Sequence, residues 1–410
     1  MLVEPDSRAA WARLGVCMAL STIGGVGMWA VIVVLPAVQA DFGADRGAAS
    51  LSYTAAMLGF AAGGVLMGRL SDRFGIVRPA LAAAALLALG FVLAAASTAL
   101  WQFAAIEFAL IGMLGGSVTF GPLMAYVSLY FRRRRGMAVS LCASGNYLAG
   151  TIWPPLLQHF VVADGWRATF IAVGLFCAVT MIPLALLLRG RPAADPAGAS
   201  AGRVGVVPGL SPGVVQAMLV VAGLACCVAM ATPQVHIVAY CADLGYGAAR
   251  GAEMLSVMLG FGIISRIGSG WLADRFGGTR TLLLGSVLQC IALLLYVQFD
   301  GLASLYVISA LFGLFQGGIV PSYAVVVREI FPAREAGARI GLVLMATMIG
   351  MAAGGWMAGA IDDWAGSYRA AFANGVLWNA INGAIVLTLL LRQRGPGPAF
   401  QGFPRQPVPR

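Results

Sequence analysis

Long apolar runs recur from one end of this chain to the other. Each is about 20 residues or longer, the length at which an α-helix crosses the hydrocarbon core of a bilayer. Lipid offers backbone amides no partner, so runs of this kind are expected to be helical. The sequence therefore predicts an all-α membrane protein with twelve transmembrane helices, near residues 14–38, 50–70, 78–98, 102–130, 137–160, 167–189, 214–240, 250–272, 279–299, 302–328, 338–360 and 367–391.

The composition excludes a soluble protein and argues against an enzyme. The chain is 60% hydrophobic and only 10% charged, whereas soluble domains carry about 25% charged residues. Every basic residue is arginine, so lysine-based chemistry is absent. The seven cysteines lie mostly in apolar runs, without a CxxC pair or a His/Cys cluster at metal-binding spacing. We predict no catalytic activity, no metal and no cofactor.

The arginines lie in short clusters between the apolar runs, which indicates topology rather than nucleic-acid binding. If the N-terminus is cytoplasmic, 21 of the 26 arginines fall on the inside, 4 fall on the outside and 1 lies within a span. By the positive-inside rule, both termini are expected in the cytoplasm. The Ala-, Gly- and Arg-rich composition is typical of a GC-rich bacterial genome, so we predict a multi-pass protein of the bacterial inner membrane.

The chain divides into two similar halves. The longest polar break predicts an N-terminal six-helix bundle (1–189), a cytoplasmic linker (190–213), a C-terminal six-helix bundle (214–392) and a cytoplasmic tail (393–410). The segment from Gly68 to Gly75 recurs 202 residues later, from Gly270 to Gly277. Duplicated halves are typical of secondary transporters, in which two bundles rock about a midplane site. Such a unit is expected to work as a monomer.

The repeated segment has the pattern Gly-x-x-x-Asp-Arg-x-Gly. It resembles the signature loop of the major facilitator superfamily, which implies the fold of that family, with two pseudo-symmetric six-helix bundles. Glycine allows helices to approach closely, while the acid and the arginine can form charge-assisted bonds at a cytoplasmic gate. The predicted gating residues are Gly68, Asp72, Arg73, Gly270, Asp274 and Arg275.

A second motif resembles the monocarboxylate-transporter branch of that superfamily. It runs Tyr130-Phe131, an arginine run (132–135), Ala138, Ser144-Gly145 and Gly150, where the final glycine falls one position late. The segment Gly165-Trp166-Arg167 is similar to loops of that branch and of the oxalate/formate antiporters. Two departures matter. Ile23 stands where the branch has an acid before two glycines, and the absence of lysine makes a monoanion a better candidate than a dianion.

Arg266 is the principal candidate for substrate binding. It lies eight residues before Asp274, which is about 12 Å deeper along a helix and near the midplane. Burying a guanidinium there costs at least about 2.5 kcal/mol unless an anion or water compensates. No acid lies one turn away, so an anionic substrate could supply the partner. The resemblance implies the same role, since monocarboxylate transporters carry a substrate-binding arginine in the eighth helix. The alternative is an arginine that extends toward the cytoplasmic gate.

Further intramembrane polar residues are weaker candidates. Glu107 is an isolated carboxyl that could carry a proton, or could instead reach the outer vestibule or a polar neighbour. His236 could line the substrate path or titrate, or could be a packing histidine. Polar or aromatic cavity walls could come from Tyr126, Asn146, Tyr147, Tyr323, Trp356, Trp378 and Asn379.

Together these features predict a secondary active transporter of a small organic anion, with a monocarboxylate favoured and proton coupling left open. The expected partners are the anionic substrate and the lipid bilayer, with a proton left open as a further partner and no nucleic acid. A rival within transporters is an exporter of drugs or other amphipathic compounds. A rival of another class is a membrane sensor without transport. Substrate identity and the direction of transport stay open.

Overall fold

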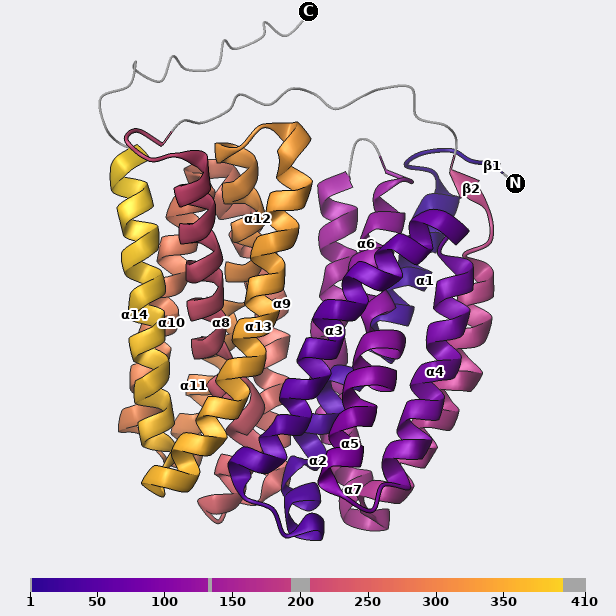
Figure 1. Ribbon diagram of the computed structural model, residues 1–410, viewed down its shortest axis with the longest axis vertical. Helices are drawn as coiled ribbons and strands as arrows, with labels where there is room; N and C mark the ends of the chain where they lie inside the picture. The colour runs from indigo at the N-terminus through magenta and orange to yellow at the C-terminus, as the bar shows by residue number, and fades with distance from the viewer. Residues whose placement is uncertain (1, 132–134, 193–206, 394–410) are drawn as a thin grey trace, which may run out of the picture.

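The computed structural model describes residues 2–131, 135–192 and 207–393, and most of this chain is helical (Figure 1). Within these described residues, eleven helices are long and apolar enough to cross a membrane. One of them, α7 (Arg135–Leu187), is 53 residues long and contains a non-helical residue, Gly165, at φ 82°. At 1.5 Å per residue α7 would exceed two bilayer cores, so it comprises two membrane helices joined at Gly165. The predicted twelve crossings are thus present.

The first half contains the elements up to the end of α7. Its first crossing is formed by α1 and α2, which meet at Gly25. Its fourth crossing is interrupted, because a nine-residue π-helix and a 3₁₀ turn separate two short α-helices. The bounds are α1 (Arg8–Gly24), α2 (Val26–Phe42), α3 (Arg46–Phe74), α4 (Val77–Ala95), α5 (Leu100–Ile106), η1 (Glu107–Gly115), η2 (Gly116–Thr119), α6 (Gly121–Ser128) and α7.

The second half begins with α8, which Ser211 caps by accepting a hydrogen bond from the Val214 amide, with Pro212 at the first helical position. Its fourth crossing is also interrupted, here by Gly317 and Gly318 between α11 and α12. The bounds are α8 (Pro212–Asp243), α9 (Ala248–Phe276), α10 (Gly278–Gln298), α11 (Leu302–Gln316), α12 (Ile319–Ile330), α13 (Ala333–Ala365) and α14 (Tyr368–Gln393).

The described ends of the chain lie at one end of the bundles. Two short parallel strands, β1 (Leu2–Val3) and β2 (Arg191–Pro192), pair beside the N-terminus. The start of α8 and the end of α14 lie at the same end (Figure 1). We call this end the terminal face and the opposite end the distal face. An even number of crossings in each half accounts for this arrangement.

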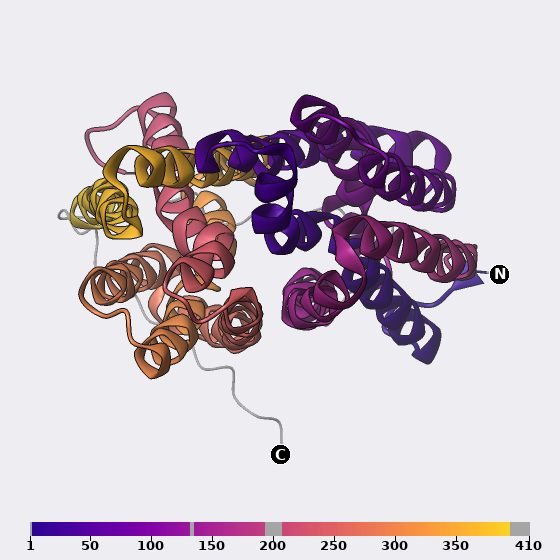
Figure 2. The same ribbon diagram turned by 90° about the horizontal axis from the view of Figure 1, so that it is seen from below.

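The two halves lie side by side (Figure 2), and one region of contact between them lies toward the distal face. There α3 and α13 approach through small residues, since a Cβ on Gly47 would lie 3.2 Å from the Ala360 Cα. The Thr54 hydroxyl also donates to the Ala352 carbonyl at 2.8 Å. Near the terminal face no described atom outside the local helix backbone lies within 4 Å of a Cβ position at Gly68 or Gly270, and the ribbons of the two halves diverge (Figure 1).

Candidate functional site

Arg266 of α9 makes its contacts with the other half of the molecule. Its guanidinium carbon lies 3.8 Å from the centre of the Tyr147 ring in α7, a cation–π geometry. Its Nη1 donates to the carbonyl of Ala143, also in α7, at 3.1 Å. One turn before Arg266, a Cβ on Gly262 would overlap the Tyr147 ring, so this glycine permits the close approach. Arg266 therefore connects the halves near the middle of the bundle.

The guanidinium of Arg266 has unused hydrogen-bonding capacity. Its Nε is buried and has no acceptor. Among the described residues, the ion pairs are Arg46–Asp243, Arg167–Asp41, Arg250–Glu253, Arg339–Glu335 and Arg369–Asp300, and none includes Arg266. A guanidinium without a carboxylate partner in a membrane bundle can accept an anion as its counter-charge.

The break in the fourth crossing of the second half lies beside Arg266. The Gly318 amide donates to the Ser265 hydroxyl at 3.1 Å, and Gly317 packs on the Gly262 backbone. The side chain before the break, Gln316, is fully buried, and its Oε1 accepts from the Tyr147 hydroxyl at 3.5 Å. No sequence motif pointed to Gln316. Its position just before two consecutive glycines inside an apolar run was the available signal.

The interrupted crossing of the first half has the equivalent position. Gly116, at the start of η2, precedes Gly318 by 202 residues, the same offset as the repeated loop segments. Gly-interrupted membrane helices at corresponding positions of two halves are typical of the binding region of transporters. By this symmetry, a binding region is expected at the level of the membrane at which Arg266 and Tyr147 meet.

Glu107 begins the π-helical part of that first interrupted crossing. Its side chain is fully buried, and both carboxyl oxygens lack a hydrogen-bond partner. Among the described residues Glu107 therefore has no hydrogen-bond partner, and its role as a proton carrier stays a prediction. A π-helical segment frequently accompanies a functional position.

His236 of α8 is fully buried and bonded at both ring nitrogens. Its Nε2 lies 2.7 Å from the Gly355 carbonyl, and its Nδ1 lies 2.9 Å from the Tyr368 hydroxyl. A carbonyl can only accept, so Nε2 donates, and the hydroxyl can donate to Nδ1 of a neutral ring. This arrangement joins α8, α13 and α14, as expected for the packing alternative.

The remaining candidates lie at separate places. The Tyr126 hydroxyl accepts from Arg13 and donates to the Leu188 carbonyl at 2.9 Å, near the terminal face. The Tyr323 hydroxyl donates to Asn382 at 2.7 Å within the second half. Asn146 precedes Tyr147 in the chain, but its side chain contacts Trp29 and Met28. The other residues predicted to line a cavity also lie apart from one another. Tyr147 contacts Arg266, and Asn379 donates to Ser286 at 2.7 Å. Trp378 packs on the core, whereas Trp356 is 44% exposed.

The predicted gating motif lies at matching helix ends. Arg73 lies in the last turn of α3 and Arg275 in the last turn of α9. Each guanidinium lies over an aromatic ring of its own helix, at 5.2 Å from Phe74 and 5.5 Å from Trp271. Gly68 and Gly270 lie in the same helices, with open space at their Cβ positions. The side chains of Asp72 and Asp274 lie outside the described part of the structure.

A polar cluster closes the distal face and was not anticipated from the sequence. Arg46, at the start of α3, pairs with Asp243 at the end of α8 at 2.9 Å. The Asp363 carboxylate of α13 accepts from the Arg46 and Gly47 amides at 2.9 and 2.6 Å. An acid from one half thus caps a helix of the other half, where the helix dipole favours negative charge. We call Arg46, Gly47, Asp243 and Asp363 the distal latch.

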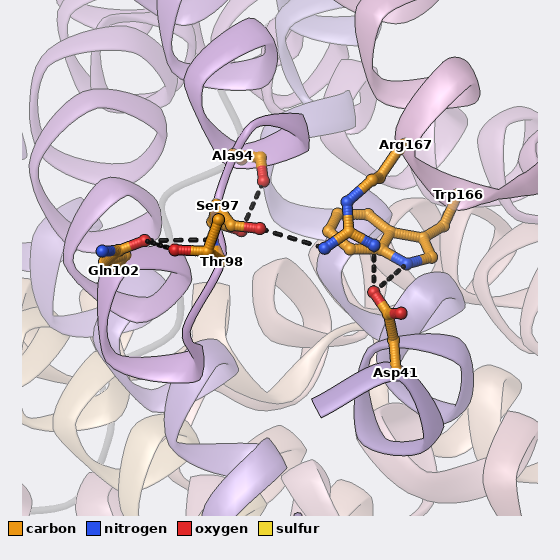
Figure 3. Close-up of polar contacts among 7 residues, drawn as sticks. All are labelled: Asp41, Ala94, Ser97, Thr98, Gln102, Trp166 and Arg167. Carbon is orange, nitrogen blue, oxygen red and sulfur yellow. Dashed lines mark hydrogen bonds and ion pairs between the residues drawn. The ribbon is translucent and has the colours of Figure 1, made fainter. Parts of the chain in front are cut away.

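The motif Gly165-Trp166-Arg167 organises the distal end of the first half (Figure 3). Asp41, near the end of α2, accepts from Arg167 and, at 3.2 Å, from the Trp166 indole. Arg167 also donates to the Ser97 carbonyl at 3.0 Å. In the second half Arg369, 202 residues after Arg167, pairs with Asp300 at 2.6 Å. The two arginines hold equivalent positions, but their acid partners do not, because Asp243, 202 residues after Asp41, pairs with Arg46 instead.

Comparison with known proteins decides the family. The family model described as Major Facilitator Superfamily matches residues 17–299 and 254–410. The chain belongs to the major facilitator superfamily. It is 30% identical over 341 residues to monocarboxylate transporter 13 of Bos taurus, covering 78% of this chain and 75% of that protein. The predicted resemblance to the monocarboxylate branch is thereby confirmed.

Other major facilitator proteins are similar at lower identity. The agnestins efflux protein AgnL12 of Paecilomyces divaricatus is 26% identical over 316 residues, covering 75% of this chain and 70% of that protein. A crystal structure of the nucleoside transporter NupG superposes with a TM-score of 0.72 at 11% identity, covering 93% of this chain and 99% of that one. The structural likeness shows the major facilitator fold, and the homologues are membrane transporters.

Proposed function

We propose that this major facilitator transporter moves a small organic monoanion, of the monocarboxylate class, with its carboxylate bound to Arg266. The observation that carries the proposal is the contact set of Arg266. It stacks on Tyr147, donates to one carbonyl and has no carboxylate partner among the described residues. A guanidinium fork matches a carboxylate, which would supply the missing counter-charge. The name of the cow relative supports the substrate class.

Alternating access about Arg266 completes the proposal. The latch on the distal face and the divergence toward the terminal face support a state open to the terminal face. The arginine distribution supports a cytoplasmic terminal face in a bacterial inner membrane. In this account 1–189 and 214–392 are the moving halves of a monomer, joined by 190–213 and followed by the tail 393–410. The repeated residues Gly68, Asp72, Arg73, Gly270, Asp274 and Arg275 serve the cytoplasmic gate.

Proton coupling through Glu107 is the second part of the proposal. The Glu107 carboxyl is fully buried and makes no hydrogen bond with the described residues. A structural hydrogen bond therefore does not explain why an acid occupies this position. Its position in the first interrupted crossing corresponds to the crossing beside Arg266 in the second half. Proton uptake at Glu107 would remove a buried charge, so the two protonation states would favour different packing of η1 on α3 and α4.

Export of an amphipathic compound is the alternative function. The fungal efflux relative favours it, because that protein is similar over most of this chain. An exporter of this kind would prefer neutral or cationic amphipathic compounds and would leave Arg266 without a substrate carboxylate.

Uptake by proteoliposomes separates these functions. Purified protein is reconstituted, and uptake of labelled butyrate, 2-oxobutyrate and benzoate is compared with uptake of butyramide and of a lipophilic cation. The proposal predicts saturable uptake of at least one acid, inhibited by other acids and unaffected by the amide. Preference for the amide or the cation, with no acid transported, would reject the anion proposal in favour of export.

A further inference from the structure

Two buried N–H groups that have no acceptor among the described residues belong to side chains in contact with Tyr147. The first is Nε of Arg266, whose guanidinium stacks on the tyrosine ring at 3.8 Å. The second is Nε2 of Gln316, whose other amide atom accepts from the tyrosine hydroxyl at 3.5 Å. Gln316 is fully buried and Tyr147 is 6% exposed. The Tyr147 side chain therefore contacts both of the side chains that carry these donors, Arg266 and Gln316.

Gln316 differs from the other buried amides in the described residues. Gln289, Asn379 and Asn382 donate to Cys226, Ser286 and Ser286 respectively. The side-chain nitrogen of Gln316 is the single amide nitrogen that is buried without an acceptor in the part of the chain that the structure describes. A buried donor left without an acceptor costs about 1–3 kcal/mol, so an amide at this position needs a compensating role.

The location of Gln316 suits contact with a substrate. It is the last residue of α11, directly before the break at Gly317 and Gly318. Gly317 packs on the Gly262 backbone one turn from Arg266, which brings the end of α11 to the level of the guanidinium. A molecule bound to Arg266 would therefore lie beside the end of α11.

We propose that Gln316 is a specificity-determining residue that donates to a second acceptor oxygen of the substrate. The transporter would then prefer acids with an oxo or hydroxyl oxygen on the carbon chain over the plain alkyl acid. This inference rests on the proposed carboxylate anchor at Arg266. A site built to hydrogen-bond a substrate group rejects the analogue that lacks it, because its own polar group is then left unpaired. Tyr147 positions the amide, and its hydroxyl is not required for the carboxylate contact.

Binding of butyrate, 2-oxobutyrate and 3-hydroxybutyrate to the purified full-length protein tests the inference. Wild type should bind at least one oxygenated acid about tenfold more tightly than butyrate, the ratio that 1.4 kcal/mol produces. Gln316→Leu should bring that ratio close to one while the affinity for butyrate changes little. Tyr147→Phe keeps the ring under Arg266 and should reduce the ratio partially, which provides a second variant if Gln316→Leu does not fold. Gln289→Leu, a buried glutamine with partners at both amide atoms, is the matched control and should keep the wild-type ratio.

The outcomes separate the two proposals. A wild-type ratio near one, or an unchanged ratio in the folded Gln316→Leu or Tyr147→Phe variants, would overturn the role of Gln316 and leave the anchor intact. Absence of acid binding by wild type, or undiminished butyrate binding by Arg266→Gln, would instead overturn the carboxylate anchor, and the role of Gln316 with it.

Discussion

Arg266 and Tyr147 join the two halves of the transporter, with the guanidinium carbon 3.8 Å from the centre of the tyrosine ring. Their helices, α9 and α7, belong to different halves. A ligand that binds Arg266 therefore binds at a contact that must rearrange when the halves rock. Under the proposed function, this arrangement would couple occupancy of the site to the conformational change through one pair of side chains.

Gly262 sets the distance between α9 and Tyr147, so Gly262→Ala should impair function. Alanine is the better helix former, but its Cβ would overlap the tyrosine ring. Overpacking of this kind costs about 1–3 kcal/mol, so we expect transport to fall about tenfold or more with the protein still folded. Gly268→Ala is the control, because no heavy atom lies within 4 Å of its Cβ position. Equal initial uptake rates for the two variants would show that this close approach is unimportant.

The distal latch should hold the distal face closed. Asp363→Asn removes the negative charge that caps α3 and weakens two bonds between the halves. Since the charge at a helix N-terminus is worth about 0.3–1 kcal/mol and charge-assisted bonds more, we expect the open population to rise severalfold. The readout is labelling of Ser50→Cys, a fully buried interface position, by an impermeant thiol reagent in a cysteine-free background. Asp300→Asn breaks an ion pair within one half and should leave the rate unchanged. An unaltered labelling rate in Asp363→Asn would show that the distal latch does not hold the distal face closed.

Glu107→Gln should uncouple transport from the proton gradient. The amide is close in shape to the protonated acid but cannot release a proton, so accumulation driven by a pH gradient should disappear while counterflow exchange continues. Glu253→Gln, which alters a surface ion pair with Arg250, should retain both activities. Unchanged accumulation in Glu107→Gln would exclude this residue from coupling, and loss of both activities would indicate a structural role.

Topology can be tested by cysteine labelling in intact cells. A single cysteine at Ala199, in the linker, should resist an impermeant reagent, whereas one at Ala163, an exposed position beside the kink at Gly165, should react. The expectation follows from the arginine distribution. Labelling at Ala199 with protection at Ala163 would reverse the orientation.

Local sequence signals were sufficient to predict the membrane crossings and the repeat of the two halves. Apolar runs of membrane length identified the helices, and the repeated loop segment identified the family. Arg266 stood out because a lone charge inside an apolar run is rare, which requires no knowledge of its neighbours. By contrast, Arg46 and Asp363 meet across 317 positions of sequence, and their charges look like ordinary helix-end residues. No periodicity predicts that contact.

The same limit applies to polar residues within the spans. His236 and Tyr368 are 132 positions apart, so the sequence could not decide between a titrating and a packing histidine. Gln316 is an uncharged side chain within an apolar run, and its importance lies in the missing acceptor, which only the packed structure reveals. Residue type alone identified the polar side chains that are most costly to bury. Whether their hydrogen-bonding groups find partners depends on residues from distant helices, which the sequence does not show.

The affinity of a carboxylate for Arg266 variants tests the central claim most directly. The ligand is the tightest-binding acid among butyrate, 2-oxobutyrate and benzoate, measured by calorimetry on wild type, Arg266→Lys, Arg266→Gln and the control Arg250→Gln, which changes an exposed arginine. Charge-assisted bonds are worth about 1.5–3 kcal/mol, so we expect both Arg266 variants to bind about 10- to 100-fold more weakly. Lysine should rescue poorly because it lacks the planar fork, and the control should bind as wild type does. If folded Arg266→Lys and Arg266→Gln bind the acid with wild-type affinity, Arg266 is not the substrate anchor.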